Sequence, residues 1–173
     1  MAIYLRKAAP TDLTKIMDII RAARQFLHAH TIPQWQNGEG PDEKQLIQDI
    51  ATQQCYVLIV DQEIAGLGII SSDIEEPYEQ IKNGHWQQAS KDYVVIHRVA
   101  IDPVYHGKGH ALLLMNLLIT TARLNNQFDI RIDTHPDNKP MQHLIKKAGF
   151  HYQGELSLPV ADGQRFAYQL ILS

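Results

Sequence analysis

One stretch carries most of the information about the fold: Val95-Ile96-His97-Arg98-Val99-Ala100-Ile101-Asp102-Pro103-Val104-Tyr105-His106-Gly107-Lys108-Gly109-His110-Ala111. Its order predicts a buried strand, a bend at Pro103, a turn of small residues and then a strongly apolar helix. Glycines in such a turn let several successive N–H groups point into one concavity. The first turn of the helix adds unpaired N–H donors with positive dipole character. A concavity of this kind suits a diphosphate group.

Other phosphate-binding motifs fit this stretch poorly. The P-loop pattern GxxxxGK[ST] is absent. A dinucleotide-binding GxGxxG fingerprint needs Gly or Ala where Leu112 stands, and it needs a tighter turn after the strand. Taken alone, Gly107-Lys108-Gly109 is more often a turn that only begins a helix, so the rest of the sequence must decide.

Hydrophobic periodicity divides the chain into strands and helices. Alternating or β-branched runs predict strands at 3–8, 55–60, 64–71, 93–101, 128–133, 151–158 and 166–172. Apolar residues at helical spacing predict helices that begin near Thr11-Asp12 and Asp42, and others over 109–123 and 138–148. Residues 32–41 predict a loop, and residues 72–91 an irregular excursion. This order predicts an α/β (α+β) fold, one mixed sheet with helices on both faces, and excludes an all-parallel nucleotide-binding sheet.

The composition indicates a single domain over residues 1–173. A chain of 173 residues can bury about 70% of its unfolded surface without a metal or a disulfide. A net charge of −3 gives no general attraction to nucleic acid, and no apolar run approaches the length of a membrane span. The single cysteine, Cys55, cannot form an internal disulfide, and the N-terminus has no signal-peptide pattern. We therefore expect a soluble cytoplasmic protein with no nucleic-acid or membrane partner.

Two motifs stand in this order of elements. The segment His106-Gly107-Lys108-Gly109-His110-Ala111 directly follows Val99-Ala100-Ile101-Asp102-Pro103. The second motif is Asn138 at the start of a helix that closes with Ala148-Gly149-Phe150. Together they resemble a bacterial branch of the GNAT superfamily of N-acetyltransferases, whose signature is [Gln/Arg]-x-x-Gly-x-[Gly/Ala]. The resemblance covers nearly the whole chain and implies a mixed, largely antiparallel sheet with helices on both faces.

The resemblance implies that acetyl-CoA is the cosubstrate. Its diphosphate would lie on the backbone of Gly107, Lys108, Gly109, His110, Ala111 and Leu112. Its pantetheine arm would lie like an extra strand along Val99, Ala100 and Ile101, and Asn138 would add a side-chain contact. Lys108 would pair with phosphate or remain a solvated turn lysine. His106 stands where Arg or Gln is usual and His110 where a small or apolar residue is common, but binding by the backbone depends on neither side chain.

Acetyl transfer to an amine needs a base, because a lysine-like amine is largely protonated at neutral pH, and histidine is matched to this task. His97 precedes Val99 by two residues, so we expect both side chains on one face of the sheet. Serotonin-type acetyltransferases of the superfamily carry a catalytic His at this relative position. His135, after the next strand, is a second candidate; for both, a structural hydrogen bond is the alternative. The Glu base of histone-type members falls on Val95 and the usual Tyr acid on Ile145, so neither is carried over.

Three residues are candidates for the acceptor site. Trp35 and Trp86 lie in irregular segments, where large aromatic residues often line a pocket, although local packing explains them equally well. Asp133, at a strand end, would bind a cationic amine or orient a histidine, unless it is an ordinary strand-end carboxylate. No HExxH or CxxC spacing occurs, so we expect no metal. Cys55 lies in an apolar run that predicts a buried thiol, which gives an acyl-cysteine mechanism little support.

The sequence therefore predicts an N-acetyltransferase that passes the acetyl group of acetyl-CoA directly to a primary amine of a small molecule or peptide in a ternary complex. One alternative is a non-catalytic acyl-CoA-binding or sensor module on the same fold. Another, from a different class, is a dinucleotide-binding protein. The acceptor is not specified, because its pocket is built from loops. Edge strands near the C-terminus would allow a homodimer.

Overall fold

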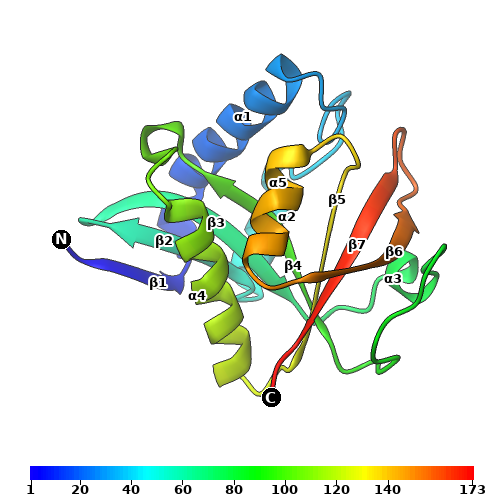
Figure 1. Cartoon of the computed structure of the whole chain (residues 1–173). Helices are drawn as coiled ribbons and strands as arrows, with labels where there is room; N and C mark the ends of the chain where they lie inside the picture. Colours follow the sequence, from blue (N-terminus) through cyan, green and yellow to red (C-terminus); the bar gives the residue numbers. More distant parts are fainter.

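Seven strands form one sheet in the computed structural model, which describes all 173 residues (Figure 1). The strands are β1 (Ile3–Lys7), β2 (Cys55–Val60), β3 (Glu63–Ser71), β4 (Val94–Ile101), β5 (Asp129–Thr134), β6 (His151–Ser157) and β7 (Gln164–Ile171). The helices are α1 (Leu13–Ala29), α2 (Glu43–Ala51), α3 (Glu76–Glu79), α4 (His110–Leu124) and α5 (Lys139–Lys147), with 3-10 turns at Pro10–Asp12 and Pro103–Tyr105. Every predicted strand and helix is present, and α3 is a short addition inside the excursion before β4.

The sheet has the strand order β1-β2-β3-β4-β5-β7-β6. Every neighbouring pair is antiparallel except β4 and β5, which run parallel. The predicted α/β (α+β) fold with a mixed, largely antiparallel sheet is therefore confirmed. The strand order adds one feature that periodicity could not show, because β7 lies between β5 and β6.

The parallel strands β4 and β5 diverge soon after they meet. They pair only at Val94 with Ile130 and at Val95 with Arg131. β4 then bends at Arg98, which has a φ of +54°, and its register against β3 shifts there. A non-glycine residue at positive φ is uncommon, and an extra residue in one strand is a β-bulge that bends it. Beyond Val95, the edge of β4 that faces β5 has no strand partner.

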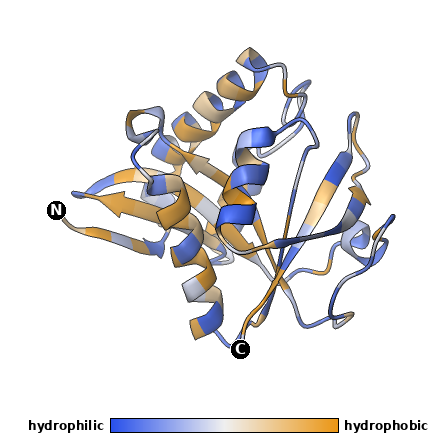
Figure 2. Cartoon of the chain, viewed as in Figure 1, coloured by the Kyte–Doolittle hydropathy of each residue, from blue (hydrophilic) through white to orange (hydrophobic).

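Helices cover both faces of the sheet. α1 and α2 pack on one face through a core that includes Ile16, Ile20 and Leu46. α4 and α5 pack on the other face through residues that include Leu114 and Ile145. In the cartoon of Figure 2 most of α5 is coloured hydrophilic, whereas α4 has a larger hydrophobic share. None of the helices is both long and apolar enough to span a membrane.

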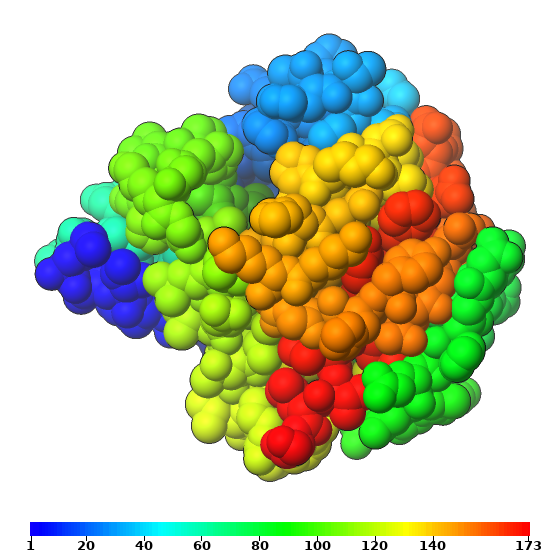
Figure 3. Space-filling view, viewed as in Figure 1, coloured from blue at the N-terminus to red at the C-terminus, as the bar shows by residue number.

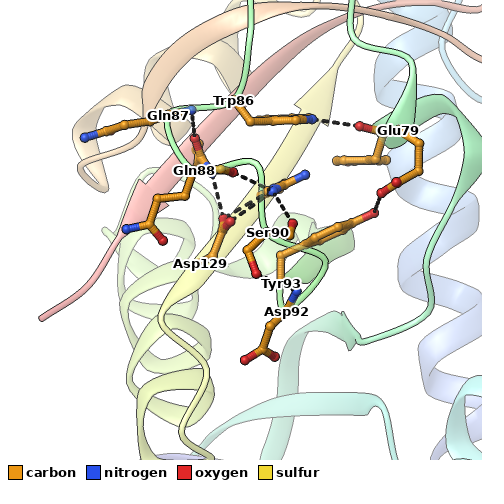
Figure 4. A network of polar contacts seen from close by, with 11 residues as sticks. Glu79, Trp86, Gln87, Gln88, Ser90, Asp92, Tyr93 and Asp129 are labelled. Carbon is orange, nitrogen blue, oxygen red and sulfur yellow. Dashed lines mark hydrogen bonds and ion pairs between the residues drawn. The ribbon is translucent and has the colours of Figure 1, made fainter.

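The segment between β3 and β4 is held on the sheet by a buried arginine, whose neighbours Trp86, Tyr93 and Asp129 are labelled in Figure 4. Arg131 is 1% exposed and forms an ion pair with Asp129 at 3.0 Å. Its guanidinium carbon lies 4.3 Å from the ring centre of Trp86 and 3.8 Å from that of Tyr93. The same guanidinium donates to two main-chain oxygens of the segment, each at 3.0 Å. The segment that carries α3 is thus anchored by charge and by stacking.

Candidate active site

A cavity of about 850 Å³ opens where β4 and β5 diverge. Its walls come from α1, the loop between α1 and α2, β4, the turn before α4, the end of β5, and α5. Figure 3 shows the surface hollowed where the green turn before α4, the blue α1 and the yellow-orange α5 meet. The volume falls in the range of small-molecule and cofactor sites.

The turn before α4 forms a cradle of unpaired N–H groups, the segment from Gly107 to Leu112. Gly107 and Gly109 have φ values of +72° and +80°, which glycine adopts without steric cost. The N–H groups of the cradle donate to no acceptor within the protein. A Cβ at either glycine would meet no atom within 4 Å, so the backbone of the cradle is open to a ligand. With the positive end of the α4 dipole, these donors fit a diphosphate.

The side chains of the cradle point in different directions. Nε2 of His106 lies 3.0 Å from the carbonyl oxygen of Ile101, and Nζ of Lys108 donates to the carbonyl oxygen of Val104 at 3.0 Å. Lys108 alone among the residues predicted to hold the cosubstrate lies outside the cavity wall. His110 is buried, and its Nδ1 has no hydrogen-bond partner. The donors of the cradle are therefore main-chain groups.

Asn138 caps α5 at one side of the cavity. Its Oδ1 accepts from the N–H of Met141 at 3.2 Å, and its Nδ2 donates to Oε1 of Gln34 at 3.0 Å. The same oxygen of Gln34 accepts from the hydroxyl of Thr134 at 3.3 Å and from the N–H of His135 at 3.4 Å. Gln34 therefore connects the loop between α1 and α2 to the start of α5. Gln34 and Asn138 both form part of the cavity wall.

His97 lies in the cavity wall beside a carboxylate. Its Nε2 is 2.8 Å from Oε1 of Glu75, and the side chain of His97 is 16% exposed. Burial alone would raise the pKa of Glu75, but His97 and Arg98 outweigh burial and hold the pKa of this carboxyl below its ordinary value. Glu75 is therefore ionised at neutral pH, and His97 has an anionic neighbour.

Asp133 lies at the end of β5 and is held on two sides. Tyr78 donates its hydroxyl to Oδ2 of Asp133 at 2.5 Å, and Nε of Arg165 lies 3.6 Å from Oδ1. Burial, and next the charge of Asp133, raise the pKa of Tyr78 well above its ordinary value. Burial lowers the pKa of Arg165, although Asp133 opposes that effect. Asp133 and Arg165 both belong to the cavity wall.

The bulge at Arg98 changes the alternation of side chains along β4. Val99 packs in the core beneath α4, whereas Val95 packs with Tyr78 in a separate cluster. The ring of His97 lies 6.3 Å from that of Tyr78, so His97 shares a face with Val95. The expectation that His97 and Val99 share a face is therefore wrong, because the extra residue of the bulge reverses the alternation. His97 and Arg98 both reach the cavity wall.

His135, the second candidate base, does not line the cavity. Its Nδ1 accepts from the N–H of Asp137 at 3.0 Å, and Gln142 donates to its carbonyl oxygen at 3.3 Å. Burial, and next the charge of Arg165, lower the pKa of His135. The geometry therefore places His135 in the turn between β5 and α5, with Nδ1 already occupied.

The two predicted pocket tryptophans differ in position. Trp35 lines the cavity. Trp86 lies outside it, because its ring stacks on Tyr78 at 5.8 Å and its Nε1 donates to the carbonyl oxygen of Tyr78 at 2.7 Å. For Trp86 the interpretation as pocket lining is thus corrected to local packing. No group of three or more His, Cys, Asp or Glu side chains is arranged to hold a metal ion.

Four polar residues in or beside the site were not indicated by the sequence: Gln34, Glu75, Tyr78 and Arg165. They come from three separate parts of the chain, the loop between α1 and α2, the segment around α3, and β7, and only the fold brings these parts to one site. Gln34 alone had a usable signal, since it directly precedes Trp35 in the same loop.

This geometry fits the class of proteins that hold a diphosphate-bearing ligand by main-chain donors beside two diverging strands. Residues 24–150 match the family model of the acetyltransferase (GNAT) family. The chain therefore belongs to the GNAT acetyltransferase family, and the resemblance drawn from the two motifs is confirmed. No curated protein matches the sequence.

Solved structures share the fold over nearly the whole chain. A GNAT-family acetyltransferase from Streptococcus agalactiae 2603 is 31% identical, with a TM-score of 0.89 over 99% of this chain and 96% of that chain. A GNAT-family acetyltransferase from Listeria monocytogenes 4b F2365 is 21% identical, with a TM-score of 0.77 over 98% and 95%. The aminoglycoside acetyltransferase AAC(6')-Ib in complex with coenzyme A is 19% identical, with a TM-score of 0.69 over 98% and 95%.

Proposed function

We propose that this protein is an N-acetyltransferase that passes the acetyl group of acetyl-CoA directly to a primary amine of a small molecule or peptide. The observation that carries the proposal is the cradle, whose unpaired N–H groups open into the same cavity as His97. The transfer requires that the acyl donor, which carries the diphosphate, and a side chain able to accept a proton meet in one site.

The residues of the site fit coenzyme A. The cradle would bind its diphosphate, and the unpaired edge of β4 from Val99 to Ile101 would pair with the amide groups of its pantetheine arm. Asn138 would hold the start of α5 in place on the opposite side. Bound acetyl-CoA supplies an activated thioester, and the main-chain N–H groups near Val99 would donate to the acetyl oxygen as negative charge develops there.

His97 would accept the proton of the attacking amine, directly or through a water. The side chain lines the cavity at the level where β4 leaves β5, next to the predicted path of the pantetheine arm. Our proposal assigns this role to His97 and not to His135, because only His97 borders the cavity. A general base of this kind accounts for about 10²–10⁴-fold in rate.

A direct transfer is favoured over a covalent acyl-enzyme. Cys55 is the only cysteine, is fully buried in β2 and does not line the cavity. Burial raises the pKa of its thiol to about 12, so almost none of it is thiolate at neutral pH. Both substrates would therefore have to occupy the cavity together.

The acceptor end of the cavity suits an amine. Glu39 and Asp133 bring carboxylates to this end, and Trp35 adds an aromatic wall. Among the structural neighbours, AAC(6')-Ib was also solved with parmomycin and acetyl-CoA. We extend to this chain only the class of acceptor, a compound with a primary amine, since the loops that form this end differ in sequence from protein to protein.

Two measurements test the proposal. Titration calorimetry with coenzyme A and acetyl-CoA measures binding, and release of free thiol from acetyl-CoA across a panel of amines measures transfer. We expect binding, turnover with at least one amine, and a loss of about 10²–10⁴-fold in kcat for His97→Ala. Absence of binding to the wild-type protein refutes the assignment. Binding without turnover on any amine favours the non-catalytic acyl-CoA-binding alternative.

A further inference from the structure

The contact between Glu75 and His97 joins two separate parts of the chain. Glu75 immediately precedes α3, in the segment between β3 and β4, whereas His97 lies on β4. The two side chains meet at 2.8 Å at the cavity wall, with Glu75 itself 36% and His97 16% exposed. The contact therefore forms only when β4 and the anchored segment that precedes it are both in place.

The segment that carries Glu75 is fixed next to His97 by Tyr78. Tyr78 is fully buried, donates to Asp133 on β5 and stacks on Trp86, whose ring also packs against the guanidinium of Arg131. The N–H of Tyr78 also donates to the main-chain oxygen of Glu75 at 3.0 Å. The side chain of Glu75 makes no capping bond to α3. The backbone of the segment therefore holds this carboxylate in place, and no helix cap competes with its contact to His97.

The charges around His97 come from three elements. Glu75 and Tyr78 face it from the α3 segment, Arg98 adjoins it on β4, and Asp133 on β5 stands behind Tyr78. Arg98 is itself paired with the buried Asp49 of α2 at 3.2 Å. Glu75 is thus the one anion in direct contact with the imidazole.

We propose that Glu75 is a positioning residue that fixes the tautomer of His97, with the proton on Nε2 and the lone pair of Nδ1 turned to the amine. Nε2 of His97 has no aligned hydrogen-bond partner, but a lone pair on Nε2 would lie 2.8 Å from the carboxylate oxygen of Glu75 and be repelled by it. This repulsion favours the proton on Nε2 and leaves Nδ1 as the acceptor. The proposal rests on the proposed function, in which His97 is the base. As the amine lone pair forms the new C–N bond and the C–S bond breaks, the amine proton moves to Nδ1 and coenzyme A leaves as a thiolate. The proton then returns to that thiolate through solvent.

The tautomer can be measured without any substrate. In protein labelled with ¹⁵N-histidine, long-range proton–nitrogen spectra identify the protonated ring nitrogen, and the signal of His97 is the one missing from His97→Gln. We expect the Nε2–H form in the wild type, the same form in Glu75→Gln, whose side-chain oxygen still accepts, and a mixture of tautomers in Glu75→Ala. The Nδ1–H form in the wild type, or an unchanged spectrum in Glu75→Ala, overturns the proposal.

Kinetics provide a second, independent readout, with an amine that supports turnover in the panel above. We expect Glu75→Ala to lower kcat by about 10–100-fold with the KM for acetyl-CoA unchanged, and Glu75→Gln to recover part of the loss, since orientation is a fraction of what a general base contributes. Glu76→Ala is the matched control, because Glu76 is exposed and accepts only from Gln80. In the His97→Ala background, Glu75→Ala should have no further effect.

The two proposals fail in different ways. If Glu75→Ala raises the KM for the amine equally with and without His97, Glu75 binds the acceptor directly and the positioning role is refuted. If the wild-type protein shows no heat with coenzyme A, the proposed function fails, whereas the tautomer experiment still reports whether Glu75 orients His97.

Discussion

Replacing Gly109 by alanine tests the cradle directly. Gly109 precedes the first residue of α4 with φ and ψ of +80° and 0°, and its carbonyl oxygen accepts from the N–H of Leu113 at 3.1 Å. An alanine Cβ at this position meets no protein atom within 4 Å. The substitution therefore causes no clash inside the protein. Its two effects are backbone strain and a methyl group placed where the cradle opens.

The strain can be estimated from the left-handed conformation. An L-residue with a Cβ costs about 1–2 kcal/mol there, and the lower entropy of the unfolded alanine chain returns about 0.4–1 kcal/mol. The net loss of at most about 1.6 kcal/mol corresponds to at most about 6 °C in Tm for a chain of this length. A matched control exists in Gly38→Ala, because Gly38 has a φ of +81°, meets no atom within 4 Å of its Cβ position and lies outside the cavity wall.

The effect on the ligand should be larger and specific. A methyl group in the cradle would displace at least one phosphate oxygen from its N–H donor, and a hydrogen bond to a charged group contributes about 1.5–3 kcal/mol. We therefore expect coenzyme A to bind Gly109→Ala about 10–100-fold more weakly, and Gly38→Ala as tightly as the wild type. Calorimetry and thermal melts of the three proteins measure both quantities. Equal affinity in all three would refute the cradle as the diphosphate site.

Three further outcomes follow from buried groups. Cys55, with a pKa of about 12, should not react with Ellman's reagent until the protein is unfolded, and rapid labelling of the native protein would contradict its burial. The pKa of His135 is lowered in the folded protein, so the unfolded chain takes up the proton first and this residue costs stability as pH falls below about 6.5. Urea unfolding at pH 7.5 and 5.5 should therefore show that His135→Gln loses less free energy of unfolding on acidification than the wild type does. An equal loss in both proteins would refute the reasoning. Arg131→Met leaves the buried Asp129 without its cation and should lower the free energy of unfolding by about 3–5 kcal/mol, which a loss under about 1 kcal/mol would contradict.

The fold was predictable because its elements follow clear periods. The strands β2 and β3 are continuous apolar runs, as expected for strands covered on both faces, and the helix α4 is apolar over most of its surface. The cradle was equally visible, since a strand, two nearby glycines and an apolar helix are all local features of the sequence. Local features of this kind can be recognised in the sequence without knowledge of the tertiary structure.

The acceptor end was not predictable in the same way. Trp86 lies in an irregular segment, and no periodicity indicates that its ring packs on Arg131, which lies about 45 residues further along the chain. Glu75 lies in the same segment and reaches His97 only because that segment folds back over the sheet. Both positions are set by contacts between residues far apart in sequence, which a pattern of single residues does not encode.

The bulge at Arg98 is a local feature of β4 that shapes both the fold and the site. A strict alternation predicts that His97 and Val99 share a face, and it fails because one residue at a φ of +54° shifts the register between them. A non-glycine residue in this region carries about 1–3 kcal/mol of strain, which persists only where the surroundings hold it. Here the ion pair of Arg98 with the buried Asp49 is one contact that stabilises this backbone conformation. The bend has two results that a regular strand could not give at once: Val99 turns into the core beneath α4, and the edge of β4 beside it is left without a strand partner, open to a ligand that pairs like a strand.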